Sequence, residues 1–248
     1  MPDKLFKTKG IVLRTVKYGE TSVIVTIFTE LFGVRPYLVN GVRKSTKKGS
    51  GKANLFQPAA ILDMIVYHNE LKNLQRIREF RWGFLYSHIL SDVKKNAVAL
   101  FLIELLTKCL KQPEANPDLF QFTEDIFMHL DSSTENAAAN LPLFFALHLT
   151  VFLGLRMNDN YSDSKTFLDL QEGGFVDEKP HHPYFVEDKE ARITSHILKV
   201  MQPEELEDTM LNHEFRKSLL YVYEKYYALH IPDFGSLRSL PVLSELFS

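Results

Sequence analysis

The fold of the first third of the chain is decided by the stretch KGIVLRTVKYGETSVIVTIFTE at residues 9–30. It contains two runs rich in β-branched residues, 9–16 and 21–29, with Tyr18-Gly19-Glu20 between them. β-Branched side chains favour strands, and a glycine between two such runs favours a tight turn. The stretch therefore predicts a β-hairpin.

Three further strands are predicted around this hairpin. Leu31-Phe32-Gly33 turns the chain into the run 34–39, and the runs 59–67 and 71–77 flank a turn at 68–70. Five short antiparallel strands in about 70 residues, with one long connection after the third, are typical of an OB-type barrel. A small open sheet is the alternative, because its strands would show the same two-residue period.

Beyond residue 82 the apolar residues recur at the spacing of helices. Ser91-Asp92 caps the first predicted helix, Asn116-Pro117 begins the second, and Gly154 ends a third that starts near Ala138. Two more are predicted at 188–201 and 212–229, after an irregular segment with a hairpin at 167–176. We therefore expect an α+β protein with an OB-fold barrel at 1–82 and a helical bundle at 83–248, in which 158–183 is a small insertion.

The composition is that of a globular protein, because 45% of the 248 residues are hydrophobic and 24% are charged. The most apolar window, 141–155, is shorter than the roughly 18 residues of a membrane span, so it predicts a buried helix and no membrane association. The start has no apolar run of signal-peptide length. The single cysteine, Cys109, suits a reducing compartment. We expect a cytoplasmic protein.

Charge is divided unevenly along the chain. Residues 1–82 contain 15 Lys and Arg against 6 Asp and Glu, a net charge of +9, whereas 83–248 contain 14 against 25, a net charge of −11. Such asymmetry indicates that one half meets a polyanion. The alternative is a chance segregation of solvated faces.

The segment 40–52 is the strongest candidate for binding nucleic acid, because basic side chains among small residues wrap a phosphate backbone. The predicted DNA-binding residues are Arg14, Lys17, Arg35, Arg43, Lys44, Lys47, Lys48 and Lys52. Four aromatics are candidates for stacking on bases, with a core position as the alternative for each: Tyr18, Phe32, Tyr37 and Phe56. A linker without function is the alternative for the segment itself.

Signals for catalysis or metal binding are weak. His181 and His182 are adjacent, so in an extended segment they point in opposite directions and make a poor chelate. The sequence has no phosphate loop, no nucleophile elbow and no His-Glu-x-x-His pattern. Cys109 lies among apolar residues, as a core thiol does. We expect no catalytic residue, no metal, no cofactor and no enzymatic activity.

Four runs stand in a specific order: Gly10-Ile11-Val12-Leu13-Arg14, Tyr18-Gly19-Glu20-Thr21-Ser22, Gly41-Val42-Arg43-Lys44-Ser45 and Leu55-Phe56-Gln57-Pro58. Together with Ile24–Glu30 they resemble the N-terminal domain of the RecO family of bacterial DNA recombination and repair proteins. The region around Leu153-Gly154 and the ending Leu237-Arg238-Ser239-Leu240 are similar to its helical domain.

The resemblance implies an OB fold, a helical bundle and the activity of a recombination mediator after DNA damage. Such a protein binds single- and double-stranded DNA, anneals strands and works with RecR to help RecA replace single-stranded-DNA-binding protein. Family DNA contacts fall on Arg35, Arg43 and Lys44. The acidic tail of single-stranded-DNA-binding protein is expected on the helical domain, with Arg156 and Arg238 as candidates.

Many relatives carry a four-cysteine zinc module in the place of 158–183. This chain has no cysteine there, so the resemblance implies a metal-free hairpin. Two other functions remain open from the residues alone. One is a protein-interaction adaptor whose basic loop docks on an acidic partner, and the other is a nucleic-acid hydrolase with dispersed carboxylates.

Overall fold

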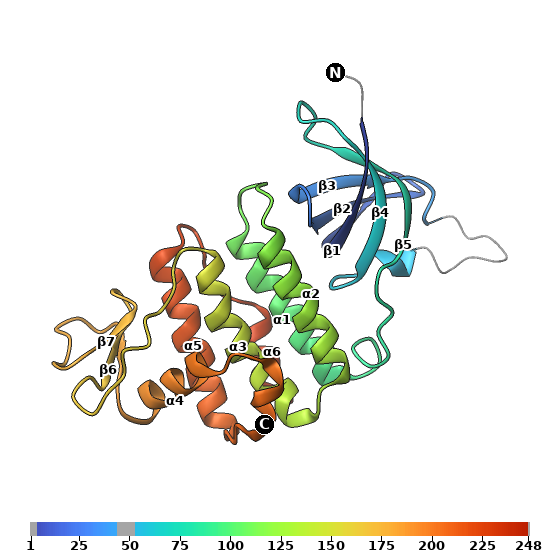
Figure 1. The fold of residues 1–248 in the computed structure, drawn as a ribbon. Coiled ribbons are helices and arrows are strands. Elements are labelled where there is room, and N and C mark those ends of the chain that lie inside the picture. The colour runs from blue at the N-terminus through green and yellow to red at the C-terminus, as the bar shows by residue number, and fades with distance from the viewer. Residues whose placement is uncertain (1–3, 44–52, 248) are drawn as a thin grey trace. The chain divides into compact units, whose positions relative to one another are not determined.

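The computed structural model describes residues 4–43 and 53–247, and Figure 1 labels their elements. The chain forms two compact units by its internal contacts: Met1–Ser87 with Leu110–Met128, and His88–Cys109 with His129–Ser248. A single cut at residue 82 does not produce these units, because the chain returns to the first unit at Leu110. The division into separate domains at 82 stays a prediction.

The first unit contains a five-stranded closed barrel. Its strands are β1 (Lys4–Tyr18), β2 (Ser22–Thr29), β3 (Gly33–Val39), β4 (Ile61–His68) and β5 (Gln75–Trp82), with a 3-10 helix η1 (Ala53–Phe56) before β4. The strands pair in the order β1-β2-β3-β5-β4. The ring is closed by a short parallel pairing, Tyr37 with Gln75 and Leu38 with Arg76. The predicted OB-type barrel is confirmed.

The barrel core follows the two-residue period of the strands. On β2, Val23, Val25 and Ile27 are buried, whereas Ile24 and Thr26 between them are half-buried. Successive side chains of a strand point to opposite faces, so the first set lines the inside and the second set the outside. The inside is filled by Val12, Val23, Val25, Ile27, Tyr37, Val39, Leu62, Met64 and Val66.

The fifth strand differs from the prediction of 71–77, because β5 begins only at Gln75. The residues between β4 and β5 form a hydrogen-bonded loop. The Asn69 N–H donates to Oε1 of the buried Gln75 (3.0 Å), and Gln75 Nε2 donates to the Asn69 carbonyl (2.9 Å). The Leu71 N–H donates to Asn69 Oδ1, as in an Asx turn. Leu71 is exposed, so the leucines of this loop imitate a strand pattern without forming one.

Helix α2 (Pro117–Ser132) contributes to the first unit through its residues up to Met128. Phe120 packs on Phe28 of the barrel, with ring centroids 5.5 Å apart. Close by, the backbone of Glu114 meets Gly33, where an added Cβ would lie 2.1 Å from the Glu114 carbonyl oxygen. Gly33 also has a φ of +63°, so both its conformation and this contact require glycine.

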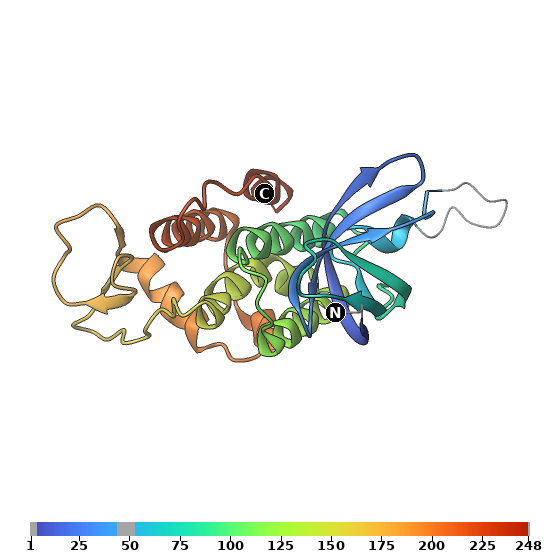
Figure 2. The same cartoon turned by 90° about the horizontal axis from the view of Figure 1, so that it is seen from above.

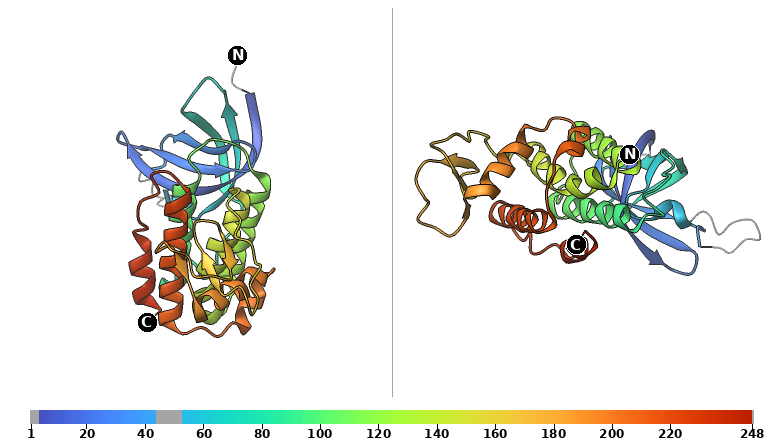
Figure 3. Two further views of the ribbon diagram at one scale, coloured as in Figure 1. Left: turned by 90° about the vertical axis from the view of Figure 1, so that its left-hand side faces the viewer. Right: turned by 90° about the horizontal axis from the view of Figure 1, so that it is seen from below.

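The second unit is helical. It contains α1 (Val93–Cys109), α3 (Glu135–Phe152), α4 (Asp188–Lys199), η2 (Pro203–Asp208), α5 (His213–His230) and α6 (Ser239–Leu246). The predicted caps are confirmed, since Asp92 accepts from the N–H groups of Lys94 and Lys95, and Asn116 caps α2 in the same way. α3 starts earlier than predicted because Thr134 is its N-cap. The sequence did not predict α6, which packs against α1 (Figure 3).

The buried helix expected at 141–155 is α3, whose residues from Leu141 to Leu147 are all buried. None of the helices in the described ranges has the length and apolar character that a membrane crossing needs. The hairpin predicted at 167–176 is confirmed as β6 (Phe167–Asp169) and β7 (Gly174–Val176). A third strand, β8 (Phe185–Val186), pairs with the other side of β6, and this small sheet lies beside α4 (Figure 2).

Candidate nucleic-acid interface

One row of side chains runs across all five strands on the outside of the barrel. The strand register places Val16 of β1 opposite Ile24 of β2, Ile24 opposite Leu38 of β3, and Leu38 beside Arg76 of β5. Arg76 in turn lies opposite Tyr67 of β4. Paired residues share a face, so these five side chains form a continuous strip, here called the outer row.

Two shorter rows flank the outer row. On one side Arg14 lies opposite Thr26, and Thr26 lies opposite Pro36. On the other side Tyr18, with 52% of its surface exposed, lies opposite Ser22 at the β1–β2 turn. The face therefore offers two tyrosines, several aliphatic side chains and two arginines. This combination of rings and cations is how OB folds bind single strands.

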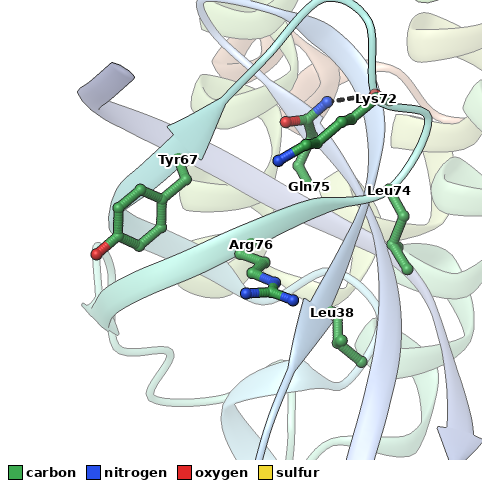
Figure 4. A pocket seen from close by; sticks show the side chains of 6 residues that line it. All are labelled: Leu38, Tyr67, Lys72, Leu74, Gln75 and Arg76. Atoms are coloured by element: carbon green, nitrogen blue, oxygen red, sulfur yellow. Dashed lines mark hydrogen bonds between the residues drawn. The ribbon is translucent and has the colours of Figure 1, made fainter. Parts of the chain in front are cut away.

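A groove of about 210 Å³ lies at the β3–β5 end of the outer row. It is lined by Leu38, Tyr67, Lys72, Leu74, Gln75 and Arg76. Figure 4 shows the Arg76 side chain extending from β5 toward Leu38 of β3. Arg14, Lys17 and Arg76 make no hydrogen bond or ion pair with any residue that the structure describes. Their charges remain available for phosphate.

Arg35 lies on the face opposite Arg14. It pairs with Ile27, whose side chain lines the barrel interior, whereas Arg14 belongs to the outside. Its Nε donates to the Phe32 carbonyl (3.2 Å) at the end of the barrel where Phe32 stacks on His68. Burial, followed by the charge of Arg35, lowers the pKa of His68. The structure thus separates Arg35 from the outer row.

Arg43 lies at the β1–β2 turn. Its backbone N–H donates to the Thr21 carbonyl (3.0 Å) and its guanidinium donates to the Gly19 carbonyl (3.1 Å), so the start of segment 40–52 is attached to that turn. Lys17 precedes the same turn on β1 and is exposed, but it pairs with the buried Val23, so like Arg35 it is separated from the outer row. The other predicted cations, Lys44, Lys47, Lys48 and Lys52, lie outside the described residues.

The four candidate stacking aromatics separate into two groups. Tyr37 and Phe56 are buried in the barrel core, so the stacking role suggested for them is wrong and the core alternative holds. Burial raises the pKa of Tyr37 to about 12. Phe32 is engaged by His68, with ring centroids 3.9 Å apart. Only Tyr18 of the four lies on the outer face.

Sequence reasoning missed Arg76, Tyr67, Leu38 and Lys72. Arg76 and Leu38 become neighbours through the parallel closure of the barrel, which joins strands far apart in the chain. A signal for Tyr67 and Lys72 was available, because they flank the predicted 68–70 turn. In an OB fold the loop between strands 4 and 5 borders the binding face.

The helical unit has a groove of its own, about 520 Å³ in volume, beside α4. It is lined by Lys189, Arg192, Ile193, His196, Asp208, Thr209, Met210, Leu211, Asn212 and Phe215. Lys189 Nζ lies 4.1 Å from the centroid of the Phe215 ring. We call this the α4 groove. It combines an apolar floor with three basic side chains against one carboxylate.

Arg156 and Arg238 are not among the residues that line the α4 groove. Arg156 is exposed after α3, where its charge helps to lower the pKa of His148, which burial lowers most. Arg238 is the exposed N-cap residue of α6, and its backbone N–H donates to Glu104 (2.9 Å). The two arginines occupy different elements.

The small sheet is stabilised by a hydrogen-bonded pair. His182 Nε2 lies 3.1 Å from Oδ2 of the nearly buried Asp169, whose other oxygen accepts the N–H groups of Gln171 and Glu172. Within residues 4–43 and 53–247, no three His, Cys, Asp or Glu side chains converge as metal ligands. The Asp169–His182 pair does not fit a tetrahedral zinc site of the kind four thiolates make. Cys109 is half-buried.

Comparison with known proteins gives the same result for both parts of the chain. Residues 1–83 match the family model of the recombination protein O N terminal, and residues 90–241 match that of the recombination protein O C terminal. The DNA repair protein RecO of Bacteroides fragilis is 35% identical over 98% of this chain and 99% of its own length. The DNA repair protein RecO of Phocaeicola vulgatus is 33% identical over 98% of this chain and 100% of its own length. With this coverage at both ends, the chain belongs to the RecO family of DNA repair proteins.

Proposed function

We propose that the chain is a non-enzymatic recombination mediator that binds single- and double-stranded DNA, anneals complementary strands and, with RecR, helps to load RecA in place of single-stranded-DNA-binding protein. The observation that carries the proposal is the outer row. It places aromatic, aliphatic and unpaired cationic side chains on the outside of an OB barrel, in a chain of the RecO family.

The physical basis is phosphate neutralisation with base stacking. Arg14 and Arg76 supply charge on this face, and Tyr18 and Tyr67 supply rings for bases. Lys17, exposed before the β1–β2 turn, adds charge from the other face. Stacking contributes about 1–3 kcal/mol per base and tolerates any sequence. A mediator has to bind DNA of any sequence, and such a face meets that requirement.

The test is the salt dependence of DNA affinity, measured by fluorescence anisotropy with single- and double-stranded oligonucleotides. The double variant Arg14→Gln with Arg76→Gln is compared with the control Arg81→Gln. The control also neutralises an arginine of β5, but Arg81 is paired with Asp63. Each lost phosphate contact should flatten the slope of log affinity against log salt by about 0.7–0.9. Strand annealing should slow in parallel. An adaptor without DNA affinity would give no signal with any variant.

The segment 40–52 is tested by charge reversal of Arg43, Lys44, Lys47 and Lys48 to Glu. We expect weaker DNA binding and a flatter salt slope with an unchanged melting temperature, because these are charged side chains in a segment of mostly small and basic residues. An unchanged slope would assign the DNA contact to the outer row alone.

For the partner, we propose that the acidic tail of single-stranded-DNA-binding protein binds the α4 groove. Charge supports this location: the helical half is acidic overall, yet Lys189, Arg192 and His196 gather beside Phe215 and Met210. At physiological salt, exposed charges more than about 8 Å apart are largely screened. A local cationic spot therefore outweighs the distant negative charge, and the apolar floor receives an apolar terminal side chain.

The tail proposal is tested with a labelled acidic peptide ending in Phe and the full-length chain. Lys189→Glu with Arg192→Glu should weaken peptide binding at least tenfold. Arg156→Glu and Arg238→Glu, which make the same charge change elsewhere on this unit, should weaken it less than threefold. The reverse order would move the tail site to Arg156 and Arg238, the positions expected from the sequence.

A further inference from the structure

The loop 69–74 presents exposed leucines beside the DNA-binding face. Leu71 has 85% of its surface exposed, and Leu74, also exposed, lines the groove with Arg76 and Tyr67. Single exposed leucines are common on protein surfaces, so exposure alone carries no argument. What distinguishes this loop is that a buried side chain holds its backbone in one conformation.

Gln75 fixes the loop. Its side chain is 3% exposed and is hydrogen-bonded to three backbone groups: the Asn69 N–H, the Asn69 carbonyl and the Lys72 carbonyl. Figure 4 shows the bond from Gln75 to Lys72. The Lys72 N–H also donates to the Asn69 carbonyl (3.0 Å), and Asn69 Oδ1 accepts from Leu71. The exposed Leu71 side chain is therefore carried by a loop whose backbone is already ordered.

We propose that Leu71 is a wedge that enters the base stack at a junction between paired and unpaired DNA, with Gln75 as the residue that positions it. This inference rests on the proposed DNA-binding function and adds a preference for DNA structure. Proteins that bind the minor groove insert apolar side chains, leucine among them, between base steps and unstack them. A loop that is already ordered can do so without the entropic cost of ordering its backbone.

Continuity with the outer row argues for DNA as the occupant. The groove beside the loop leads from Leu74 to Arg76 and Tyr67, and the outer row continues from there to Leu38, Ile24 and Val16. A strand separated at Leu71 thus meets an arginine for its phosphate and a tyrosine for its first unpaired base. An apolar protein partner would find a cation at the same place.

The experiment uses a hairpin duplex with a single-stranded extension and 2-aminopurine at the last base pair. Binding of the native chain should raise the fluorescence, because unstacking removes the quenching of 2-aminopurine. The native chain should also bind this junction about tenfold more tightly than the unpaired strand alone. Leu71→Ala should abolish both the rise and the preference while changing affinity for the unpaired strand less than threefold. Leu31→Ala, which removes a leucine 45% exposed in the β2–β3 turn, should behave as the native chain.

Gln75→Ala is the second variant. With Leu71 intact but the loop released, the fluorescence rise should fall as in Leu71→Ala. A rise unchanged in Leu71→Ala would overturn the wedge, and the DNA proposal would stand if Arg76→Gln still weakened binding. If Arg76→Gln and Leu71→Ala both left DNA binding unchanged while Leu71→Ala weakened binding to RecR, the loop would be a protein contact and the wedge would be wrong.

Discussion

The ion pair between Lys9 and Glu124 predicts that one lysine of the basic barrel serves stability and not DNA binding. Lys9 Nζ lies 2.8 and 2.9 Å from the two carboxylate oxygens of Glu124 on α2, and the Glu124 side chain is only 5% exposed. The hydrogen bond to Glu124 raises the pKa of Lys9, so the lysine is charged at neutral pH. Lys9→Ala leaves a buried carboxylate without its cation.

The magnitude follows from these contacts. Hydrogen bonds to charged groups contribute about 1.5–3 kcal/mol, and an unpaired buried charge costs more. Because Lys9 keeps 44% of its side chain exposed, solvent screens part of the interaction, and we expect a loss of about 2 kcal/mol. For a chain of this length that lowers the melting temperature by about 4–8 °C.

The assay combines thermal denaturation followed by circular dichroism with DNA binding by anisotropy. Lys9→Ala should melt earlier and bind DNA within twofold of the native chain. Adding Glu124→Gln should recover part of the loss, because the neutral amide needs no cation. An unchanged melting temperature together with weaker DNA binding would refute the reasoning and place Lys9 among the phosphate contacts.

Three further predictions concern the core, protonation and metal content. Phe120→Ala should cost about 3–5 kcal/mol in denaturant unfolding, since Phe120 is buried against Phe28, and a loss below 1 kcal/mol would mean that α2 does not complete the barrel unit. Burial lowers the pKa of His148 below 6.5, so the unfolded chain takes up the proton first and stability should fall as the pH drops from 7.5 to 5.5; His148→Phe should flatten this dependence, and an identical slope in urea titrations would contradict it. Elemental analysis should find no stoichiometric zinc and chelator should leave the melting temperature unchanged, whereas one zinc per chain would point to His181 or His182.

Local patterns in the sequence predicted most of the barrel and its helices. The run 21–29 became β2 within one residue because its β-branched side chains alternate with the pleat. Asp92 and Asn116 are caps that a few adjacent residues determine, and both hold. The loop 69–74 misled the prediction because exposed leucines imitate a strand, whereas a single buried Gln75 side chain decides the shape.

The candidate site was harder to predict from the sequence than the fold, because it depends on pairing between strands that are distant in the chain. Whether Arg14 and Arg35 share a face follows from register, which one residue of slip reverses. Arg76 reaches Leu38 only through the parallel β3–β5 pair, which no local pattern specifies. The same register sends Tyr37 inward and leaves Tyr18 outside. The charge asymmetry assigned the candidate nucleic-acid site to the half of the chain that contains the outer row, but the basic segment alone did not identify this face.

The central claim, that DNA lies on the outer row, is tested most directly by photocrosslinking. A single-stranded oligonucleotide carrying 5-iododeoxyuridine is irradiated with the full-length chain, and the crosslinked peptides are identified by mass spectrometry. We predict adducts at Tyr18 and Tyr67, the two rings on this face, and their loss at high salt. Adducts confined to the helical unit, with none between β1 and β5, would contradict the account.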